Sequence, residues 1–363
     1  MLMIGRKYGE ETRMKDLHVR LSDRLKRGER IALAVLLEAR GSAPQKAGAA
    51  ALFSARKLVD GTVGGGALEA AVRRSASLAL RTGAPCVFEC ALKGRDLEEE
   101  EPVCGGEVKV LVDPRPDRHR SVFAALADAL AHRRRGVLAT TITTAPGAPT
   151  VVKRDWIEAT SRSSLDRKIV AAFADGKPGL AGVRVPDSGA NELLFIEPVF
   201  PPCRLVVAGA GHIGRAVAGL GNLLEFEVTV VDDRRAFANR ANLPGADRVI
   251  CADIGATLRA LAVSRDAYIV IVTRGHRQDT EALRACIGST AGYIGMVGSR
   301  NKIALQRAEF LERGWATAAL FDRVHAPIGI PIRSKTVPEI AVSIAAELVR
   351  VRRENMEQGG CPA

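Results

Sequence analysis

The chain has 363 residues, of which 47% are hydrophobic, enough to bury two sizeable cores. Its net charge is +12, but aromatic residues make up 4% and accompany no basic motif, which disfavours nucleic-acid binding. An anionic small ligand or an acidic partner protein remains compatible with this charge. The seven cysteines form no C-x-x-C pair, which disfavours disulfides and structural zinc and favours a reducing compartment. Residues 1–15 lack the apolar core of a signal peptide, and no apolar run is long enough for a membrane span, so we expect a cytoplasmic protein.

Hydrophobic periodicity divides the first part of the chain into helices and strands. Continuous apolar runs predict buried strands, and apolar residues spaced by three or four predict helices. We expect helices at residues 12–28, 66–80 and 121–134, and strands at residues 31–37, 49–53, 86–91, 108–112, 137–142, 150–153 and 193–198. Because Pro198, Pro201 and Pro202 punctuate the chain, we expect an N-terminal α/β domain with its connecting segment at residues 1–200 and a second domain at residues 201–363.

Three consecutive glycines, Gly64, Gly65 and Gly66, come directly before an expected helix. The first turn of a helix carries unpaired backbone N–H groups, so a glycine loop at that point can hold an anion. We expect such an anion site here. The alternative is a strand-to-helix turn that needs glycine for close backbone packing alone.

One cysteine, Cys104, lies in a glycine turn with Gly105 and Gly106 before an expected strand. An accessible sulfur near free backbone N–H groups favours the thiolate form. The alternative, a buried cysteine that only packs, stays open. The cysteines that fall in strand or helix patterns are expected in the core: Cys86, Cys90, Cys251 and Cys286.

The most specific pattern begins at Arg204, where a buried-type strand runs into Gly209, Gly211 and Gly214, spaced G-x-G-x-x-G. A helix follows, and then a second strand that ends in Asp232. This order of strand, glycine loop, helix, strand and acid is the fingerprint of a dinucleotide-binding Rossmann unit. Further strands alternate with helices, which predicts a doubly wound parallel sheet and the α/β fold class. These strands are expected at residues 248–251, 267–273 and 292–297.

The acid of this fingerprint bears on which nucleotide would bind. A carboxylate at the place of Asp232 hydrogen-bonds a ribose 2′-OH and repels a 2′-phosphate, which favours NAD. However, Arg234 and Arg235 follow at once and can pair with a 2′-phosphate, so NADP stays open.

Two loops fall at the carboxyl ends of the later strands, where ligands of such sheets bind. One loop carries Arg274 and His276, and the other carries Arg300, and we expect these side chains to form a basic wall around a ligand phosphate. Ser299 is expected to cap the helix that begins at Arg300, and Lys302 is expected to reach the same anion.

The last expected helix begins at a capping box formed by Thr336 and Glu339. Its apolar stripe needs a partner surface, which is either the sheet or a second copy of the chain. The stripe consists of Ile340, Ile344, Leu348 and Val351.

Seven short motifs follow one another along the chain: Gly-Ser-Ala-Pro at 41–44, Gly-Thr-Val-Gly-Gly-Gly at 61–66 with Glu69, Cys-Gly-Gly at 104–106, Gly-Ala-Gly-His-Ile-Gly at 209–214, Thr-Arg-Gly-His at 273–276 with Asp279, Gly-Ser-Arg at 298–300, and His-Ala-Pro-Ile-Gly at 325–329 with Pro-Glu-Ile-Ala-Val-Ser at 338–343. In this order they resemble the XdhC/CoxI family, the accessory proteins of xanthine dehydrogenase and related molybdenum hydroxylases. The resemblance spans about residues 30–353. The chain departs from the family at Gln45 and Lys46, where an arginine is usual, and at residues 330–334, which replace the usual Leu-Asp-Ile-Gly.

The resemblance implies a non-catalytic role. Family members bind the molybdenum cofactor, hold it while an oxo ligand is replaced by a sulfido ligand, and pass it to the apo-hydroxylase. This transient cargo is a pterin with a dithiolene-held metal and a phosphate, so it needs anion cradles and a soft ligand. By this resemblance residues 64–66 with Glu69, and residues 105–106, would contact the cofactor, and Cys104 would offer a thiolate to the metal. The expected partners are an apo-hydroxylase of the xanthine dehydrogenase type, a cysteine desulfurase and a second copy of the chain in a homodimer.

Two other functions stay open at this point. The first is an NAD(P)-dependent oxidoreductase that uses the Rossmann domain, although His276 is the one obvious acid or base and no catalytic pair is visible. The second is a nucleotide-sensing or scaffold protein without cargo. We also expect the two glycine loops to face one common cleft, because a phosphorylated, multi-ring ligand is too large for either loop alone.

Overall fold

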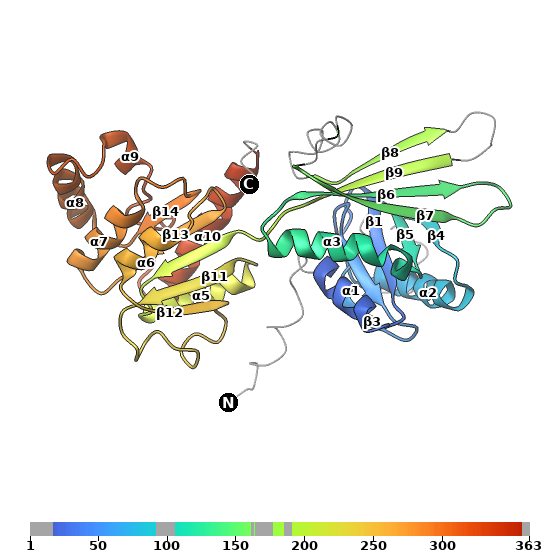
Figure 1. The fold of residues 1–363 in the computed structure, drawn as a ribbon, viewed down its shortest axis with the longest axis horizontal. Coiled ribbons are helices and arrows are strands. Elements are labelled where there is room, and N and C mark those ends of the chain that lie inside the picture. The colour runs from blue at the N-terminus through green and yellow to red at the C-terminus, as the bar shows by residue number, and fades with distance from the viewer. Residues whose placement is uncertain (1–16, 92–105, 161–162, 164–176, 185–190, 358–363) are drawn as a thin grey trace. The chain divides into compact units, whose positions relative to one another are not determined.

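The computed structural model describes residues 17–91, 106–160, 163, 177–184 and 191–357 (Figure 1). The chain divides into two compact units, Met1–Pro201 and Pro202–Ala363. Among the described residues, no helix is both long enough and apolar enough to cross a membrane.

The first unit contains an antiparallel five-stranded sheet with the order β3-β2-β1-β5-β4. Its strands are β1 (Ala32–Arg40), β2 (Ala50–Phe53), β3 (Leu58–Gly61), β4 (Cys86–Ala91) and β5 (Glu107–Asp113). Side chains of β1 alternate between two core clusters, with Leu33 and Val35 in one and Ala34 and Leu36 in the other. A strand buried on both faces needs apolar residues throughout, which explains the continuous apolar run in the sequence.

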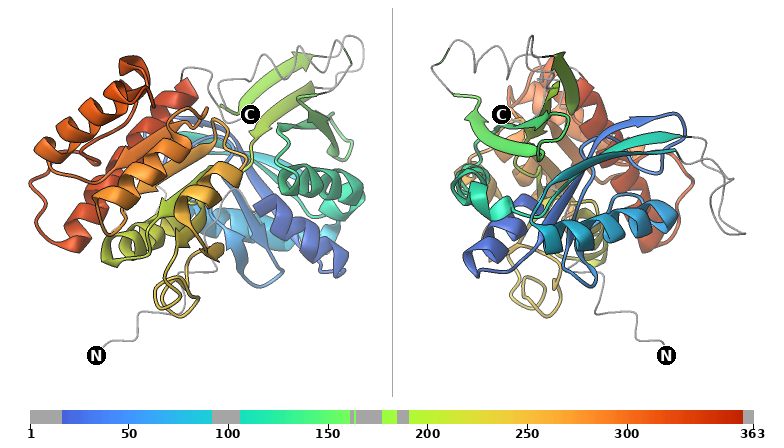
Figure 2. Two further views of the ribbon diagram at one scale, coloured as in Figure 1. Left: turned by 60° about the vertical axis from the view of Figure 1, so that its left-hand side comes forward. Right: turned by 90° about the vertical axis from the view of Figure 1, so that its right-hand side faces the viewer.

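Three helices cover the two faces of this sheet. α2 (Gly66–Thr82) runs along one face, as the right-hand view of Figure 2 shows, and α1 (Leu17–Lys26) and α3 (Arg120–Ala131) pack on the other. A 3₁₀ turn, Pro116–His119, leads into α3. The expected helices are therefore confirmed, with ends shifted by a few residues, apart from the part of the first that precedes residue 17.

A second antiparallel sheet, with the order β7-β6-β9-β8, completes the first unit. Its strands are β6 (Gly136–Thr144), β7 (Val151–Glu158), β8 (Gly179–Arg184) and β9 (Asn191–Val199). Leu138, Ile142 and Phe195 of this sheet join the core cluster of α1 and α3. β8 was not expected from the sequence because its Gly-Leu-Ala-Gly-Val-Arg run has little strand propensity, and pairing with β9 overrides that propensity.

The second unit is a doubly wound α/β fold, as predicted. All strand pairs of its sheet are parallel, and the order is β12-β11-β10-β13-β14. The strands are β10 (Arg204–Ala208), β11 (Glu227–Asp232), β12 (Arg248–Cys251), β13 (Ala267–Ile271) and β14 (Tyr293–Met296). Strand order reverses between β10 and β13, which is where such folds bind ligands.

Helices cover both faces of the parallel sheet. α5 (His212–Leu223) and α10 (Val337–Glu357) pack on one face, and α6 (Ile254–Ala260), α7 (His276–Cys286), α8 (Arg300–Glu312) and α9 (Ala318–Asp322) pack on the other. Ile344, Leu348 and Val351 of α10 share a core cluster with Leu205 of β10, so the apolar stripe of this helix packs on the sheet. The capping box is present, since the backbone N–H of Thr336 donates to Glu339 at 2.9 Å.

The cysteines expected in the core divide into three groups. Cys286 is buried, and burial raises the pKa of its thiol to about 12, which fits a packing role. Cys86 and Cys90 are half-buried, and Cys251 is exposed, so the prediction is wrong for Cys251. β12, which carries Cys251, is an edge strand of the sheet, and a short edge strand does not bury each of its side chains.

Candidate functional site

The glycine loop of the second unit follows β10 and begins α5. Gly209 has a φ of +112°, and a Cβ there would lie 2.4 Å from the carbonyl oxygen of Val272. A Cβ on Gly214 would lie 1.8 Å from the carbonyl oxygen of Gly209. Gly211 differs, because its φ of −67° suits any residue and nothing lies within 4 Å of a Cβ. The fold therefore requires the first and third glycines, whereas the second leaves open space at the N-terminus of α5.

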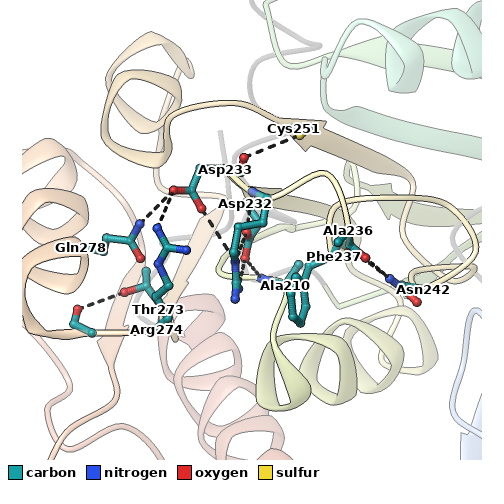
Figure 3. Close-up of polar contacts among 12 residues, drawn as sticks. Ala210, Asp232, Asp233, Ala236, Phe237, Asn242, Cys251, Thr273, Arg274 and Gln278 are labelled. Atoms are coloured by element: carbon teal, nitrogen blue, oxygen red, sulfur yellow. Dashed lines mark hydrogen bonds and ion pairs between the residues drawn. The ribbon is translucent and has the colours of Figure 1, made fainter.

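The acid at the end of β11 is tied to this loop. Asp232 accepts a hydrogen bond from the backbone N–H of Ala210 at 2.7 Å (Figure 3). It is also paired with Arg234, whose Nη2 lies 2.8 Å from Oδ2. Burial alone would raise the pKa of Asp232, but the hydrogen bonds from Arg234 and Ala210 outweigh it and hold the pKa below its usual range. Asp232 is therefore a buried, ionised anchor for the glycine loop.

The next residue, Asp233, connects the loop after β11 to the loop after β13. Its Oδ2 accepts hydrogen bonds from Arg274 at 3.2 Å and from Gln278 at 3.0 Å, and Figure 3 shows these three side chains pointing toward one another. β10 lies between β11 and β13, so this bridge spans the strand that carries the glycine loop. Neither Asp233 nor Gln278 belongs to a motif of the sequence, because residues this far apart in the chain meet through sheet order.

A second polar link joins the two loops that were expected to form a basic wall. Asp279 is fully buried at the start of α7 and lies 2.6 Å from the Thr273 hydroxyl and 2.6 Å from Lys302 Nζ. Lys302 was expected to reach an anionic ligand, but in the structure it neutralises Asp279. Ser299 caps α8 as predicted, by accepting a hydrogen bond from the backbone N–H of Lys302.

The three basic side chains proposed for the wall differ in their surroundings. Arg274 is paired with Asp233. His276 is 52% exposed and lies 3.9 Å from a carboxylate oxygen of Glu309. Arg300 is exposed and has no ion-pair partner among the described residues. The basic wall around a ligand phosphate stays a prediction. Among its three members, Arg300 alone has no acidic partner within the described residues.

In the first unit, three glycine-bearing segments meet at one place. A Cβ on Gly64 would lie 2.7 Å from Pro44, and a Cβ on Gly106 would lie 2.7 Å from the carbonyl oxygen of Arg40. The segment at residues 40–45 thus contacts both the glycine loop at 64–66 and the start of β5. The register of β1 and β5, which pairs Arg40 with Glu107, produces this convergence.

The loop that begins α2 has a backbone that favours glycine. Gly64, Gly65 and Gly66 have φ values of +125°, +73° and +53°, and a Cβ on Gly65 would meet nothing within 4 Å. Thr62 shapes the turn, because its hydroxyl accepts from the N–H of Gly64 at 3.1 Å and donates to Glu69 at 3.2 Å. No side chain caps the helix at Gly65. The turn thus needs its glycines for conformation and also leaves open space above the first turn of the helix.

The metal assignment rests on residues that the structure does not describe. Cys104 and Gly105 lie outside the described residues, and Gly106 is the first residue after that gap. In the described part of the chain, no three His, Cys, Asp or Glu side chains gather as a metal site. The two units are separate bodies, so a common cleft between their glycine loops stays a prediction.

The His-Ala-Pro-Ile-Gly motif has a structural role in the second unit. Glu347 of α10 accepts hydrogen bonds from the Tyr293 hydroxyl at 2.7 Å and the Gly329 N–H at 2.8 Å, and lies 3.2 Å from His325 Nδ1. Burial alone would raise the pKa of Glu347, but these partners outweigh it and hold the pKa below its usual range. A Cβ on Gly329 would lie 2.4 Å from the Ser343 hydroxyl, which accounts for this glycine by packing.

Comparisons with known proteins match a family model to each of the two units. The XdhC and CoxI family matches residues 24–90, and the XdhC Rossmann domain matches residues 205–348. The uncharacterized protein YqeB of Escherichia coli is 32% identical over 210 residues, which cover 54% of this chain and 38% of that protein, so the chain spans well under half of this relative. A Bacillus subtilis protein, named as one probable subunit of xanthine dehydrogenase, is 24% identical over 351 residues, which cover 94% of this chain and 98% of that protein.

One solved structure extends this similarity to the fold. A crystal structure of a Bacillus halodurans protein described as a xanthine dehydrogenase superposes with a TM-score of 0.72. The two chains are 22% identical, and the match covers 93% of this chain and 96% of that chain. At this level of identity the likeness shows a shared fold.

Proposed function

The chain belongs to the XdhC and CoxI family, and from this premise we propose that it is an accessory protein that binds the molybdenum cofactor. In this role it holds the cofactor while a sulfido ligand is installed and delivers it to an apo-hydroxylase of the xanthine dehydrogenase type. A relative that aligns over nearly the whole chain is named as part of a xanthine dehydrogenase, which supports this class of partner. A cysteine desulfurase and a second copy of the chain complete the proposed partners.

The observation that carries the proposal is the convergence of three segments in the first unit. Residues 40–45 contact both the loop 64–66, at Gly64, and Gly106, although the three segments are separate in sequence. The open space above Gly65 allows a ligand to approach the backbone at the uncapped start of α2. The arrangement suits the phosphate of a pterin cargo.

Two side chains would complete the recognition of the cargo. Lys46 is exposed, has no ion-pair partner among the described residues, and stands one residue after the position where the family usually has an arginine, so we assign it to the phosphate. Cys104 precedes Gly106 by two residues, and we assign its thiolate to the sulfur-rich metal centre. The protein then supplies a soft ligand and an anion cradle and requires no acid–base pair of its own.

The test is retention of cofactor. The full chain is purified without oxygen from a molybdenum-replete host, and bound molybdopterin is quantified by mass spectrometry. Cys104→Ser should lose most of the bound molybdopterin, whereas Cys86→Ser, a matched change of a half-buried cysteine at the start of β4, should keep it. Equal loading of the wild type and Cys104→Ser would return Cys104 to a packing role, and an empty wild type would contradict the proposal itself.

An NAD(P)-dependent oxidoreductase is the second function, favoured by the open space over Gly211 in the Rossmann loop. Such an enzyme would turn over nicotinamide cofactor without any hydroxylase present. Steady NADPH or NADH consumption by the purified chain, with no molybdopterin bound, would replace the accessory role with this one.

A further inference from the structure

The acid that ends β11 has no hydrogen-bonding capacity left for a ribose. A carboxylate offers roughly four acceptor positions. The N–H of Ala210 and Nη2 of Arg234 occupy Oδ2 of Asp232, and the N–H and Nε of Arg234 occupy Oδ1, all within 2.9 Å. The Asp232 side chain is also 2% exposed. A ribose 2′-OH could bind it only by displacing one of these donors, which would leave that donor unpaired.

Arg234, in contrast, is held in one orientation with donors to spare. A guanidinium has five N–H groups, two of which bind Asp232, so three remain. The guanidinium carbon lies 3.9 Å from the centroid of the Phe237 ring, and this stacking fixes the plane of the group. The Arg234 side chain is 26% exposed, so a ligand can reach it.

The surroundings of Arg234 are suited to an anion. Arg234 neutralises Asp232, and its Nε lies 3.9 Å from Oδ1 of the other nearby acid, Asp233, which is also paired with Arg274. The next residue, Arg235, is exposed and has no ion-pair partner among the described residues. An oriented planar fork beside a free cation is the arrangement that recognises phosphate.

This cationic group lies beside the dinucleotide loop. Asp232 connects Arg234 directly to Ala210, which lies between the first two glycines of the loop. In a Rossmann unit the adenosine ribose lies between that loop and the end of the second strand. The open space over Gly211 is where the pyrophosphate approaches.

We infer that the Rossmann unit binds a dinucleotide whose adenosine ribose carries a 2′-phosphate, of the NADP type, and that Arg234 determines this specificity. The inference reverses the preference for NAD that the sequence position of Asp232 suggested. It concerns the second unit alone and does not depend on the molybdenum cofactor proposal.

The experiment is calorimetric titration of the full chain with NADP and with NAD. NADP should bind at least about tenfold tighter than NAD, as expected for charge-assisted hydrogen bonds that NAD cannot make. Arg234→Gln should weaken NADP binding by about tenfold or more and should not weaken NAD binding by more than about threefold, because it frees acceptor positions of Asp232. Arg248→Gln is the matched control, because it removes the same charge at the opposite end of the strands.

The variant Arg234→Lys distinguishes a loss of 2′-phosphate recognition from a loss of the folded site. It keeps the charge but loses the planar fork, so its ratio of NADP to NAD affinity should fall between those of the wild type and Arg234→Gln. Tighter binding of NAD by the wild type, an equal loss of both nucleotides in either Arg234 variant, or no binding of either nucleotide would overturn the inference.

Discussion

Two alanine substitutions in the glycine loop should have opposite effects on the second unit. In Gly214→Ala the new Cβ would lie 1.8 Å from the carbonyl oxygen of Gly209 and 2.9 Å from its carbonyl carbon. Both atoms belong to the backbone of the same tight turn, so no flexible side chain can move aside. In Gly211→Ala the new Cβ meets nothing within 4 Å, and the backbone already has a conformation that alanine adopts.

The magnitudes follow from these contacts. Overpacking against movable atoms costs about 1–3 kcal/mol, and a clash with rigid backbone belongs at or above the top of that range. We therefore expect Gly214→Ala to lower the free energy of unfolding by at least about 3 kcal/mol. Gly211→Ala should raise it by up to about 1 kcal/mol, because alanine restricts the unfolded chain. For a unit of this size, a loss of about 3 kcal/mol corresponds to a fall in Tm of roughly 6–12 °C.

The assay reads the second unit selectively. The chain has two tryptophans, and Trp315 packs edge-on against Phe310 in the core of the second unit at 5.4 Å between ring centroids. In a Trp156→Phe background, tryptophan fluorescence therefore follows the unfolding of that unit. If Gly211→Ala and Gly214→Ala unfolded at the same temperature, Gly214 could not be called structural and Gly211 ligand-facing.

Two buried ionic groups give further predictions. Asp113 and Arg154 form an ion pair whose side chains are 2% and 1% exposed, so Asp113→Asn should destabilise the first unit by about 3–5 kcal/mol in thermal unfolding followed through Trp156. Adding Arg154→Met should recover most of that loss, and a double variant as unstable as the single one would contradict this account. The pKa of Glu347 is lower in the folded chain than its usual value, so its carboxylate stabilises the fold fully above about pH 4.3 and progressively less as the pH falls below that value. The difference in unfolding free energy between the wild type and Glu347→Gln should shrink over that acid range, and a pH-independent difference would count against it.

The sequence predicts the second unit better than the first. A parallel sheet is built from repeated local units, so the pattern that begins at Arg204 determines strands, helices and fold class together. The antiparallel sheets of the first unit depend on pairings between distant segments. The pairing of β8 with β9 could not be read from a Gly-Leu-Ala-Gly-Val-Arg run, because that run gains its strand conformation from its neighbour.

The candidate sites divide in the same way. The glycine loops could be identified from the sequence, because a positive φ or a close approach of two backbone segments requires glycine at a single position. The pairing of Asp232 with Arg234 was not, since their spacing allows the arginine to bind either the acid or a ligand. The bridge from Asp233 to Gln278 crosses 45 positions of sequence and depends on β11 and β13 flanking β10.

The packing of α10 on the parallel sheet has a consequence for synthesis of the chain. The described strands of the first unit all precede residue 200, whereas the core cluster around Leu205 of β10 also needs Ile344 and Leu348 from the last helix. Domains fold as units during translation, the N-terminal one first. A nascent chain that has not yet reached residue 337 therefore carries the strands of the first unit and a parallel sheet with one apolar face that α5 covers only in part. The apolar residues that α10 covers in the finished unit stay exposed throughout that interval, so the Rossmann unit completes its core only after the last turns of α10 have been made.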